Sequence, residues 1–174
     1  MGPLVKSQLH CSLRGQHLVH KRSLHFGYAS LTNESLLSAH AGLSVAPLIF
    51  WRKEYITDSG GPGEHRGGLG QVMEISHAEG APLAISKMFD RVQHPARGRD
   101  GGRPGATGRV YLRGGEDLRG MGRDVVPPGA RLVLETPGGG GLGDPTERDA
   151  ERVEDDVLNG YVSEEASREL YGVD

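Results

Sequence analysis

Three glycine-rich segments constrain the fold of this chain more than any other feature of its sequence. They run over Asp58–Gln71, Gly101–Gly108 and Glu135–Pro145, and together they hold more than half of the 28 glycines in the 174 residues. Glycine loses more backbone freedom on folding than any other residue, so each copy should serve a turn, a bulge or a close approach of two backbones. Because only 36% of the residues are hydrophobic and 5% aromatic, we expect short strands joined by tight loops rather than a helical bundle.

Apolar and alternating stretches predict β-strands between and beside the glycine-rich segments. Glycine- or proline-bearing loops separate these stretches from one another, as a β-rich domain requires. The five predicted strands lie at Pro47–Tyr55, Gln71–Ser76, Pro82–Lys87, Arg109–Leu112 and Ala130–Glu135.

The end of the chain has a helical pattern. Asp149 is placed to cap a helix that runs to about Asn159, and Ser163 is placed to cap a second helix at Glu164–Tyr171. A glycine follows each helix in the position of a left-handed C-cap. The predicted fold class is α+β, with predominantly short β-strands and glycine-rich loops closed by a C-terminal helical hairpin.

A change of composition near residues 43–47 divides the chain into two parts. Residues 1–46 carry four basic side chains and one acid, Glu34, and sum to +3, so the remaining 128 residues sum to −6. The first part shows no sustained apolar period of 2 or 3.6 residues. We expect residues 1–46 to be an atypical, poorly ordered segment with a short helix at Thr32–His40, and residues 47–174 to form the domain.

Charge, hydropathy and cysteine content exclude several classes of protein. A net charge of −3 gives no electrostatic reason to expect nucleic acid as a partner. No apolar stretch approaches the roughly 20 residues of a membrane-spanning helix, and no apolar segment follows Lys6 as in a secretory signal. Cys11 is the one cysteine and cannot form an internal disulfide. We therefore expect a cytoplasmic protein with no membrane partner.

The histidines near the amino terminus do not form a pattern typical of metal binding. His17 and His20 would share one face of a helix, but no cysteine or carboxylate pair accompanies them at ligand spacing. The sequence therefore predicts no metal site, and no cofactor bound by this chain.

The third glycine-rich segment contains the dinucleotide-binding pattern G-x-G-x-x-G at Gly138, Gly140 and Gly143. That pattern requires a βαβ unit, whereas here Asp144-Pro145 forms a turn and only helices follow. None of the three segments contains the Gly-Lys-Ser/Thr of a phosphate-binding P-loop. We therefore reject a nucleotide site in these segments.

Glycine loops can still point several backbone N–H groups at one anion or carbonyl oxygen, although sharp turns and bulges between strands are the plainer interpretation. Among the charged neighbours, Arg66 could fork onto a carboxylate or phosphate. For each charged candidate the alternative is an ion pair that fixes a loop. The candidate ligand-facing residues are Arg66, Gly67, Gly68, Asp90, Arg91, Gly139, Gly140 and Asp144, and the catalytic residues stay unidentified.

Several ordered motifs resemble the carboxy-terminal part of the hydantoinase B/oxoprolinase family. Each glycine run alone is weak support, whereas the ordered set is specific, and it covers roughly residues 47–174. The matching motifs are Trp51-Arg-Lys-Glu-Tyr55, Asp58-Ser-Gly-Gly-Pro-Gly63, Arg66-Gly-Gly-Leu-Gly70, Asp90-Arg91, Gly101-Gly-Arg-Pro-Gly105, Glu135-Thr-Pro-Gly-Gly-Gly-Gly-Leu-Gly-Asp-Pro145 and Asn159-Gly-Tyr-Val-Ser163.

The resemblance implies an ATP-dependent enzyme that opens a small cyclic amide such as 5-oxoproline or a hydantoin. In this family a B-type part works with an A-type part that handles ATP, and a divalent metal is a further candidate cofactor of the complete enzyme. Phosphorylation of the amide oxygen would make the ring carbon more electrophilic, and glycine-loop N–H groups would be suitable oxyanion or phosphate donors.

The family's B-type subunits are much longer than this chain, so we expect a fragment that is inactive alone and works in a hetero-oligomer. Three alternatives stay open. The chain could be a non-catalytic assembly module that docks an A-type partner, a fragment of a related ketone-carboxylase subunit, or a product that does not fold stably.

Overall fold

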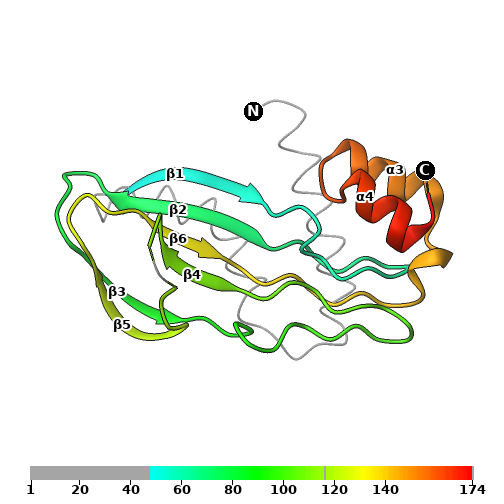
Figure 1. The fold of residues 1–174 in the computed structure, drawn as a ribbon, viewed down its shortest axis with the longest axis horizontal. Coiled ribbons are helices and arrows are strands. Elements are labelled where there is room, and N and C mark those ends of the chain that lie inside the picture. Colours follow the sequence, from blue (N-terminus) through cyan, green and yellow to red (C-terminus); the bar gives the residue numbers. More distant parts are fainter. Residues whose placement is uncertain (1–47, 116, 174) are drawn as a thin grey trace.

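A computed structural model describes residues 48–115 and 117–173 of the chain. Figure 1 shows an elongated molecule with its strands at one end, its helices at the other and long extended segments between them. Strands and helices lie in one chain without a repeating β-α unit, which confirms the predicted α+β class. The predicted segment 1–46 and its helix at Thr32–His40 lie outside the described residues.

The larger sheet has four antiparallel strands in the order β1-β2-β6-β4. All four were predicted from apolar alternation, and their observed ends lie within two residues of the predicted ones. Because side chains alternate between the faces of a strand, one face of this sheet carries the apolar residues and the other the charged ones. The strands are β1 (Leu48–Tyr55), β2 (Gln71–His77), β4 (Arg109–Leu112) and β6 (Leu132–Glu135).

A second sheet consists of two antiparallel strands, β3 (Leu83–Met88) and β5 (Met121–Val126). The sequence predicted β3, but β5 was missed. Its residues lack an apolar alternation, since only Val126 is buried, and Gly122 has a positive φ of 116°. β5 is therefore a strand because it pairs with β3, and its local sequence does not indicate it.

The hydrophobic core lies between the apolar face of the larger sheet and the smaller sheet. Ile75 on β2, Val110 on β4, Leu132 on β6 and Val126 on β5 form its buried centre. Phenylalanines and leucines from the neighbouring strands and loops pack around this centre. Burying each such branched side chain stabilises the fold by about 1.5–3 kcal/mol. This end of the molecule is therefore held together by side chains.

The middle of the molecule is held together by backbone instead. We call residues 59–70, 96–105 and 137–143 the glycine lattice, because these extended segments hydrogen-bond to one another through their backbones. Gly61 donates to the carbonyl of Gly139 at 2.8 Å, and Gly141 donates to the carbonyl of Arg103 at 2.9 Å. The segments approach so closely that most of their glycines leave no room for a Cβ atom.

The run 137–143 lies at the centre of the lattice, and the segment that each of its glycines faces repeats every third residue. A Cβ added to Gly138 or to Gly141 would collide with segment 59–63, whereas the two glycines between them face segments 67–70 and 96–98. The neighbour therefore repeats every three residues, as in an extended helix of three residues per turn. Such a helix has no internal hydrogen bonds, and Gly138, Gly139 and Gly141 donate their N–H groups to the surrounding segments instead.

The chain ends in short helical segments. The 3-10 helix η1 (Pro145–Glu147) leads into α3 (Ala150–Leu158), which the Asp149 side chain caps as predicted. The second predicted helix is only partly α-helical, because α4 (Glu164–Ala166) continues as the π-helical turn η2 (Ser167–Tyr171).

The wider turn of η2 follows from the contacts of one residue. The carbonyl of Ser167 accepts the backbone N–H groups of Gly172 and Val173, and its hydroxyl donates to the carbonyl of Val173. Gly160 and Gly172 have φ values of 71° and 70°, the left-handed conformation expected after a helix. Within residues 48–115 and 117–173, no helix has the length and apolar character needed to cross a membrane.

Candidate functional site

Four of the glycines predicted to face a ligand lie together in the glycine lattice. Gly67 donates its N–H to the carbonyl of Gly61 at 2.9 Å, and Gly139 donates to the carbonyl of Gly68 at 2.8 Å. A Cβ atom on Gly67, Gly139 or Gly140 would meet a neighbouring backbone atom at 3.0 Å or less, whereas one on Gly68 would meet nothing within 4 Å. The geometry therefore uses Gly67 and Gly139 for backbone packing, and their N–H groups point at carbonyls of the same chain.

Arg66, the charged candidate beside these glycines, forms a buried ion pair. Its Nε lies 2.9 Å from Oδ2 of Asp156 on α3, and its Nη2 lies 3.1 Å from Oδ1 of the same carboxylate. Arg148 donates from Nη2 to Asp156 Oδ2 at 2.8 Å and from Nη1 to the carbonyl of Glu64 at 3.0 Å. We call Arg66, Arg148 and Asp156 the clasp, because they join the glycine lattice to the helical end.

The clasp places two guanidinium groups and one carboxylate out of water. The side chains of Arg66, Arg148 and Asp156 are 11%, 10% and 8% exposed. Arg66 also lies over the ring of Tyr161 at 5.5 Å, and within the described residues Arg148 Nε is buried without a hydrogen-bond partner. Buried cations need a counter-ion, and Asp156 binds both arginines, so its carboxylate holds this region together.

The other charged candidates lie at the borders of the lattice. Arg91 has a positive φ of 56°, and its carbonyl accepts the N–H of Gly108 at 3.0 Å where the chain enters the lattice from β3. Asp144 caps η1, and the backbone N–H of Thr146, followed by its hydroxyl, lowers the pKa of the Asp144 carboxyl. Asp90 is exposed and precedes Arg91.

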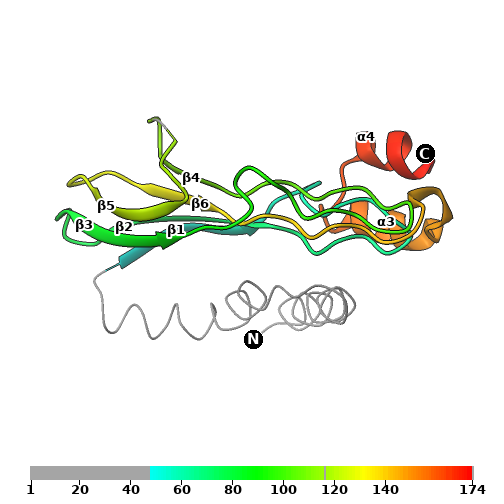
Figure 2. The same cartoon turned by 90° about the horizontal axis from the view of Figure 1, so that it is seen from below.

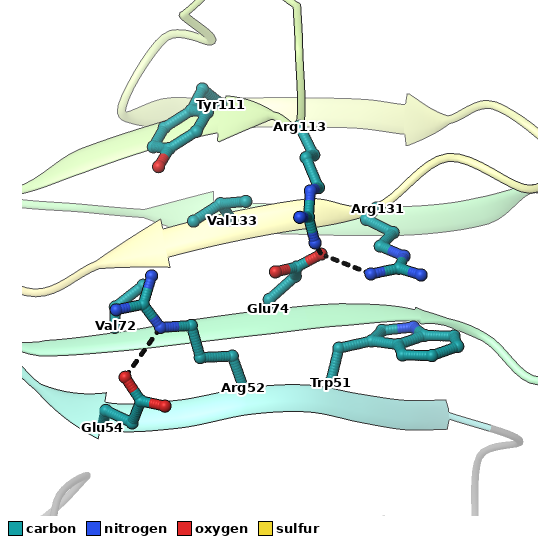
Figure 3. A pocket seen from close by; sticks show the side chains of 9 residues that line it. All are labelled: Trp51, Arg52, Glu54, Val72, Glu74, Tyr111, Arg113, Arg131 and Val133. Atoms are coloured by element: carbon teal, nitrogen blue, oxygen red, sulfur yellow. Dashed lines mark hydrogen bonds and ion pairs between the residues drawn. The ribbon is translucent and has the colours of Figure 1, made fainter.

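A different site opens on the charged face of the larger sheet, where no candidate was predicted. We call it the sheet hollow: it has a volume of about 380 Å³ and faces solvent. Figure 3 shows arginine, glutamate and aromatic side chains from β1, β2, β4 and the residues that flank β4 and β6 converging on it. Its lining residues are Trp51, Arg52, Glu54, Val72, Glu74, Tyr111, Arg113, Arg131 and Val133.

A bulge in β1 builds one wall of the sheet hollow. The register with β2 shifts between Phe50 and Arg52, so Trp51 and Arg52 both line the hollow although they are consecutive. In a regular strand two consecutive side chains would point to opposite faces. Bulges of this kind re-aim a side chain and are common beside functional sites.

Glu74 forms the floor of the sheet hollow and is held by two arginines. Its Oε1 accepts from Nη1 of Arg113 at 2.6 Å and from Nη1 of Arg131 at 3.0 Å. Burial acts to raise the pKa of Glu74, but the hydrogen bonds from Arg113 and Arg131 outweigh it and hold the pKa below its usual value. Glu74 is therefore an anion at neutral pH.

Aromatic rings fix the remaining walls. The guanidinium of Arg131 lies 3.7 Å from the ring centre of Trp51, whose Nε1 donates to the hydroxyl of Ser76 at 2.8 Å. Across the hollow, Tyr111 donates its hydroxyl to Glu135 at 2.8 Å. Burial, together with this hydrogen bond, raises the pKa of Tyr111, which therefore stays neutral.

The sequence contained one signal for this hollow. Glu74 shares a face with the apolar Val72 on a strand whose other residues are largely buried. Because a buried carboxylate is costly without a partner of opposite charge, Glu74 needs a cation beside it. Arg113 and Arg131 supply it, but they follow β4 and precede β6 in the sequence, and only the strand order β2-β6-β4 brings them to Glu74. No cluster of three or more His, Cys, Asp or Glu able to hold a metal ion exists in the described part of the chain.

Comparisons with known proteins identify relatives of this domain. A family model described as hydantoinase B/oxoprolinase matches residues 44–145, more than half of the chain. Caprolactamase subunit beta of Pseudomonas jessenii is 36% identical over an alignment of 135 residues that covers 73% of this chain and 23% of that protein.

Two solved structures resemble the fold. The crystal structure of ATP-dependent caprolactamase from Pseudomonas jessenii superposes with a TM-score of 0.56 at 32% identity, covering 75% of this chain and 24% of that one. Nucleotide-free acetone carboxylase superposes with a TM-score of 0.59 at 23% identity, covering 72% and 21%, and this likeness is one of fold. Each match spans less than a quarter of the relative's length.

Proposed function

Because the chain belongs to the hydantoinase B/oxoprolinase family, we propose that it supplies the carboxy-terminal scaffold of a B-type subunit in an ATP-dependent enzyme that opens cyclic amides. The remaining part of that subunit and an A-type partner complete the enzyme, and this chain alone has no turnover. The small cyclic amide is of the caprolactam, hydantoin or 5-oxoproline type. The length supports this proposal, since the match spans 23% of caprolactamase subunit beta.

The observation that carries the proposal is the glycine lattice. All three glycine-rich segments lie within residues 44–145, the range that the family model matches. In the structure they pack against one another, and the N–H groups of Gly67 and Gly139 are bonded to carbonyls of the lattice itself. A scaffold role suits these groups better than the binding of an oxyanion, which would require donors that are not already engaged.

The helical hairpin predicted at the end of the chain closes the scaffold in this proposal. The clasp supports it, since Asp156 on α3 binds Arg66 beside the lattice and Arg148 before the helix. A fixed helical end would give the rest of the subunit a defined surface to pack on.

The ring-opening chemistry takes place elsewhere in the complete enzyme. ATP would be handled by the A-type partner, where transfer of a phosphoryl group to the amide oxygen prepares the ring carbon for attack by water. Attack by one water followed by cleavage of the ring C–N bond would release the amine and leave an acyl phosphate. A second water would then convert the acyl phosphate into a carboxylate and inorganic phosphate. The described residues supply no ligand cluster for a metal, so no step is assigned to a metal on this chain.

A second candidate function is a non-catalytic assembly module that docks the A-type partner. The same engaged lattice favours it, because such a domain contributes shape rather than reacting groups. The two candidates differ in whether turnover depends on this chain.

The test is complementation of a caprolactamase subunit beta from which the matched segment has been deleted. This chain, the deleted subunit and the A-type partner are mixed, and ATP hydrolysis is measured together with the ring-opened product of caprolactam, hydantoin or 5-oxoproline. We expect turnover only with all three components. Turnover by this chain alone would overturn the proposal, and so would full activity of the other two components without it. Stable assembly without any gain in turnover would instead identify the assembly module.

A further inference from the structure

We propose that the sheet hollow is a binding site for a single carboxylate group. The site lies on the sheet end of the molecule, apart from the glycine lattice and the clasp. It goes beyond the scaffold role and does not rest on it. The carboxylate belongs either to a small organic acid or to an acidic side chain of another protein segment.

Unused hydrogen-bond donors are the first support for this inference. Arg113 and Arg131 each place one nitrogen, Nη1, on Oε1 of Glu74, and Arg52 places its Nε on Glu54 at 2.8 Å. A guanidinium carries five N–H donors in a planar fork, so each arginine keeps further donors. The side chains of Arg52 and Arg113 are 52% and 60% exposed, and these donors are therefore within reach of a ligand.

The charges that line the hollow indicate the charge of the ligand. Three arginines and two glutamates line it, which leaves one positive charge in excess. Glu135 is left out of this count because it does not line the hollow; its carboxylate accepts the hydroxyl of Tyr111. One carboxylate would balance the excess, whereas a doubly charged phosphate would exceed it and a cation would add to it. The planar fork of arginine also matches the two oxygens of a carboxylate.

Preorganisation is the second support. Arg131 is fixed between the ring of Trp51 at 3.7 Å and the carboxylate of Glu74 at 3.0 Å. Trp51 is itself fixed by its bond to Ser76. Donors that are already held in place lose little side-chain freedom when they bind, so more of the interaction remains as affinity.

The shape of the hollow sets the size of the ligand. A volume of about 380 Å³ exceeds that of a carboxylate alone and leaves room for a small ring or a short side chain. Val72 and Val133 line the hollow and are buried, and the half-exposed Trp51 lines it as well. These apolar surfaces would contact the carbon part of the ligand while the arginines bind its oxygens.

Trp51 provides the readout, because it is the one tryptophan of the chain and it lines the hollow. The full chain is titrated with sodium 5-oxoproline while tryptophan emission is followed. 2-Pyrrolidinone, the same ring without the carboxylate, and sodium chloride at equal ionic strength are the ligand controls. A short peptide with blocked ends and one glutamate tests the side-chain source.

We expect a saturable change of emission with 5-oxoproline, with the glutamate peptide or with both, and none with 2-pyrrolidinone or chloride. A response to 5-oxoproline alone identifies a small-acid site, and a response to the peptide alone identifies a side-chain site. The absence of saturation with either carboxylate overturns the proposal. An equal response to 2-pyrrolidinone or chloride overturns it as well.

The variant Arg113→Gln separates binding at the hollow from a general effect on the protein. Loss of a charge-assisted hydrogen bond should raise the Kd about tenfold or more. Arg119→Gln is the matched control, since Arg119 is exposed and does not line the hollow. Both variants should remain folded, as a cooperative melting curve shows, and Arg113→Gln should melt somewhat lower because it removes one of the two arginine bonds to Glu74. An unchanged Kd in folded Arg113→Gln overturns the proposal, and none of these results depends on turnover by the complete enzyme.

Discussion

Two regions of this domain, the sheet end and the glycine lattice, fill space in opposite ways. At the sheet end, the branched side chains of Ile75, Val110, Val126 and Leu132 pack between two sheets. In the glycine lattice, backbones pack directly on backbones. At most of its glycines, a neighbouring carbonyl already occupies the place where a Cβ atom would lie. Figure 2 shows how thin this part of the molecule is, with extended segments running side by side between the sheets and α3.

The comparison teaches that the two regions tolerate opposite substitutions. A side-chain core is weakened when a methylene is removed, because a cavity remains. A backbone lattice has no side chain to remove and is weakened when a methyl is added. The lattice also bonds N–H groups such as those of Gly67 and Gly139 to its own carbonyls, whereas the charged face of the larger sheet keeps donors available. The glycine lattice is therefore suited to support, and the charged face of the larger sheet is suited to recognition.

The largest effect is expected for Gly67→Ala in the lattice. The new Cβ would lie within 3.0 Å of the carbonyl of Gly139, and both segments are fixed by hydrogen bonds, so neither can move aside. We expect a loss of more than about 5 kcal/mol in the free energy of unfolding, which removes the cooperative transition. Circular dichroism during chemical denaturation measures it.

Gly68→Ala is the matched control for this substitution. A Cβ there meets nothing within 4 Å, so the variant should lie within about 1 kcal/mol of the wild type. If the two neighbouring variants unfolded alike, the lattice would not be the tight backbone packing described above.

The next largest effect is expected for Asp156→Asn, which tests the connection between lattice and helices. The substitution removes the charge of the carboxylate that binds the buried guanidinium groups of Arg66 and Arg148, and breaking a buried ion pair typically costs about 3–5 kcal/mol. The free energy of unfolding from urea denaturation gives the magnitude. The neighbouring Asp155→Asn changes an exposed carboxylate on the same helix and should cost less than about 0.5 kcal/mol. Equal values for the two would show that the clasp does not hold the helical end.

These regions also differ in how far the sequence predicted them. Apolar alternation located β1, β2, β3, β4 and β6, because each has a buried face that its own residues encode. The N-caps Asp149 and Ser163 were predicted equally well, since the capping bond is local. β5 was missed because its strand conformation depends on pairing with β3.

The glycine lattice could be predicted only in part. The density of glycine indicated close approaches, but nothing local distinguishes Gly67, which is packed, from Gly68, which is open. The sheet hollow was missed altogether, since a bulge in β1 and the order of the strands bring its residues together. Arg66 was predicted to face a ligand, with an ion pair as the alternative, and in the structure it binds Asp156, which lies 90 residues away in the chain.

A smaller, pH-dependent effect is expected for Glu74→Gln on the charged face. The two arginine bonds to Glu74 are partly screened, since Arg113 is 60% exposed, so the loss at pH 7 should be about 1–2 kcal/mol. Because folding lowers the pKa of Glu74, its contribution is present above the unfolded pKa of about 4.3 and is lost as the pH falls through the folded value.

The difference between wild type and Glu74→Gln should therefore be full at pH 7 and shrink below about pH 4. Urea denaturation of both proteins at a series of pH values measures it. A difference that stayed constant down to pH 2 would mean that the carboxylate charge is not what the arginines stabilise.

The smallest effect is expected for Ile75→Val in the hydrophobic core, and it sharpens the comparison most directly. This change removes one methylene at the sheet end, just as Gly67→Ala adds one methyl to the lattice. Ile75 is buried among Val110, Val126 and Leu132, and the cavity left by one methylene costs about 0.5–1.5 kcal/mol because the neighbours relax partly into it. Val125→Ala, on the exposed side of β5, is the control and should cost less than about 0.5 kcal/mol.

Side chains can adjust their rotamers, whereas two hydrogen-bonded backbones cannot separate without breaking their bonds. A single carbon should therefore cost several times more in the lattice than in the core, and equal costs in chemical denaturation would contradict the distinction between the two regions.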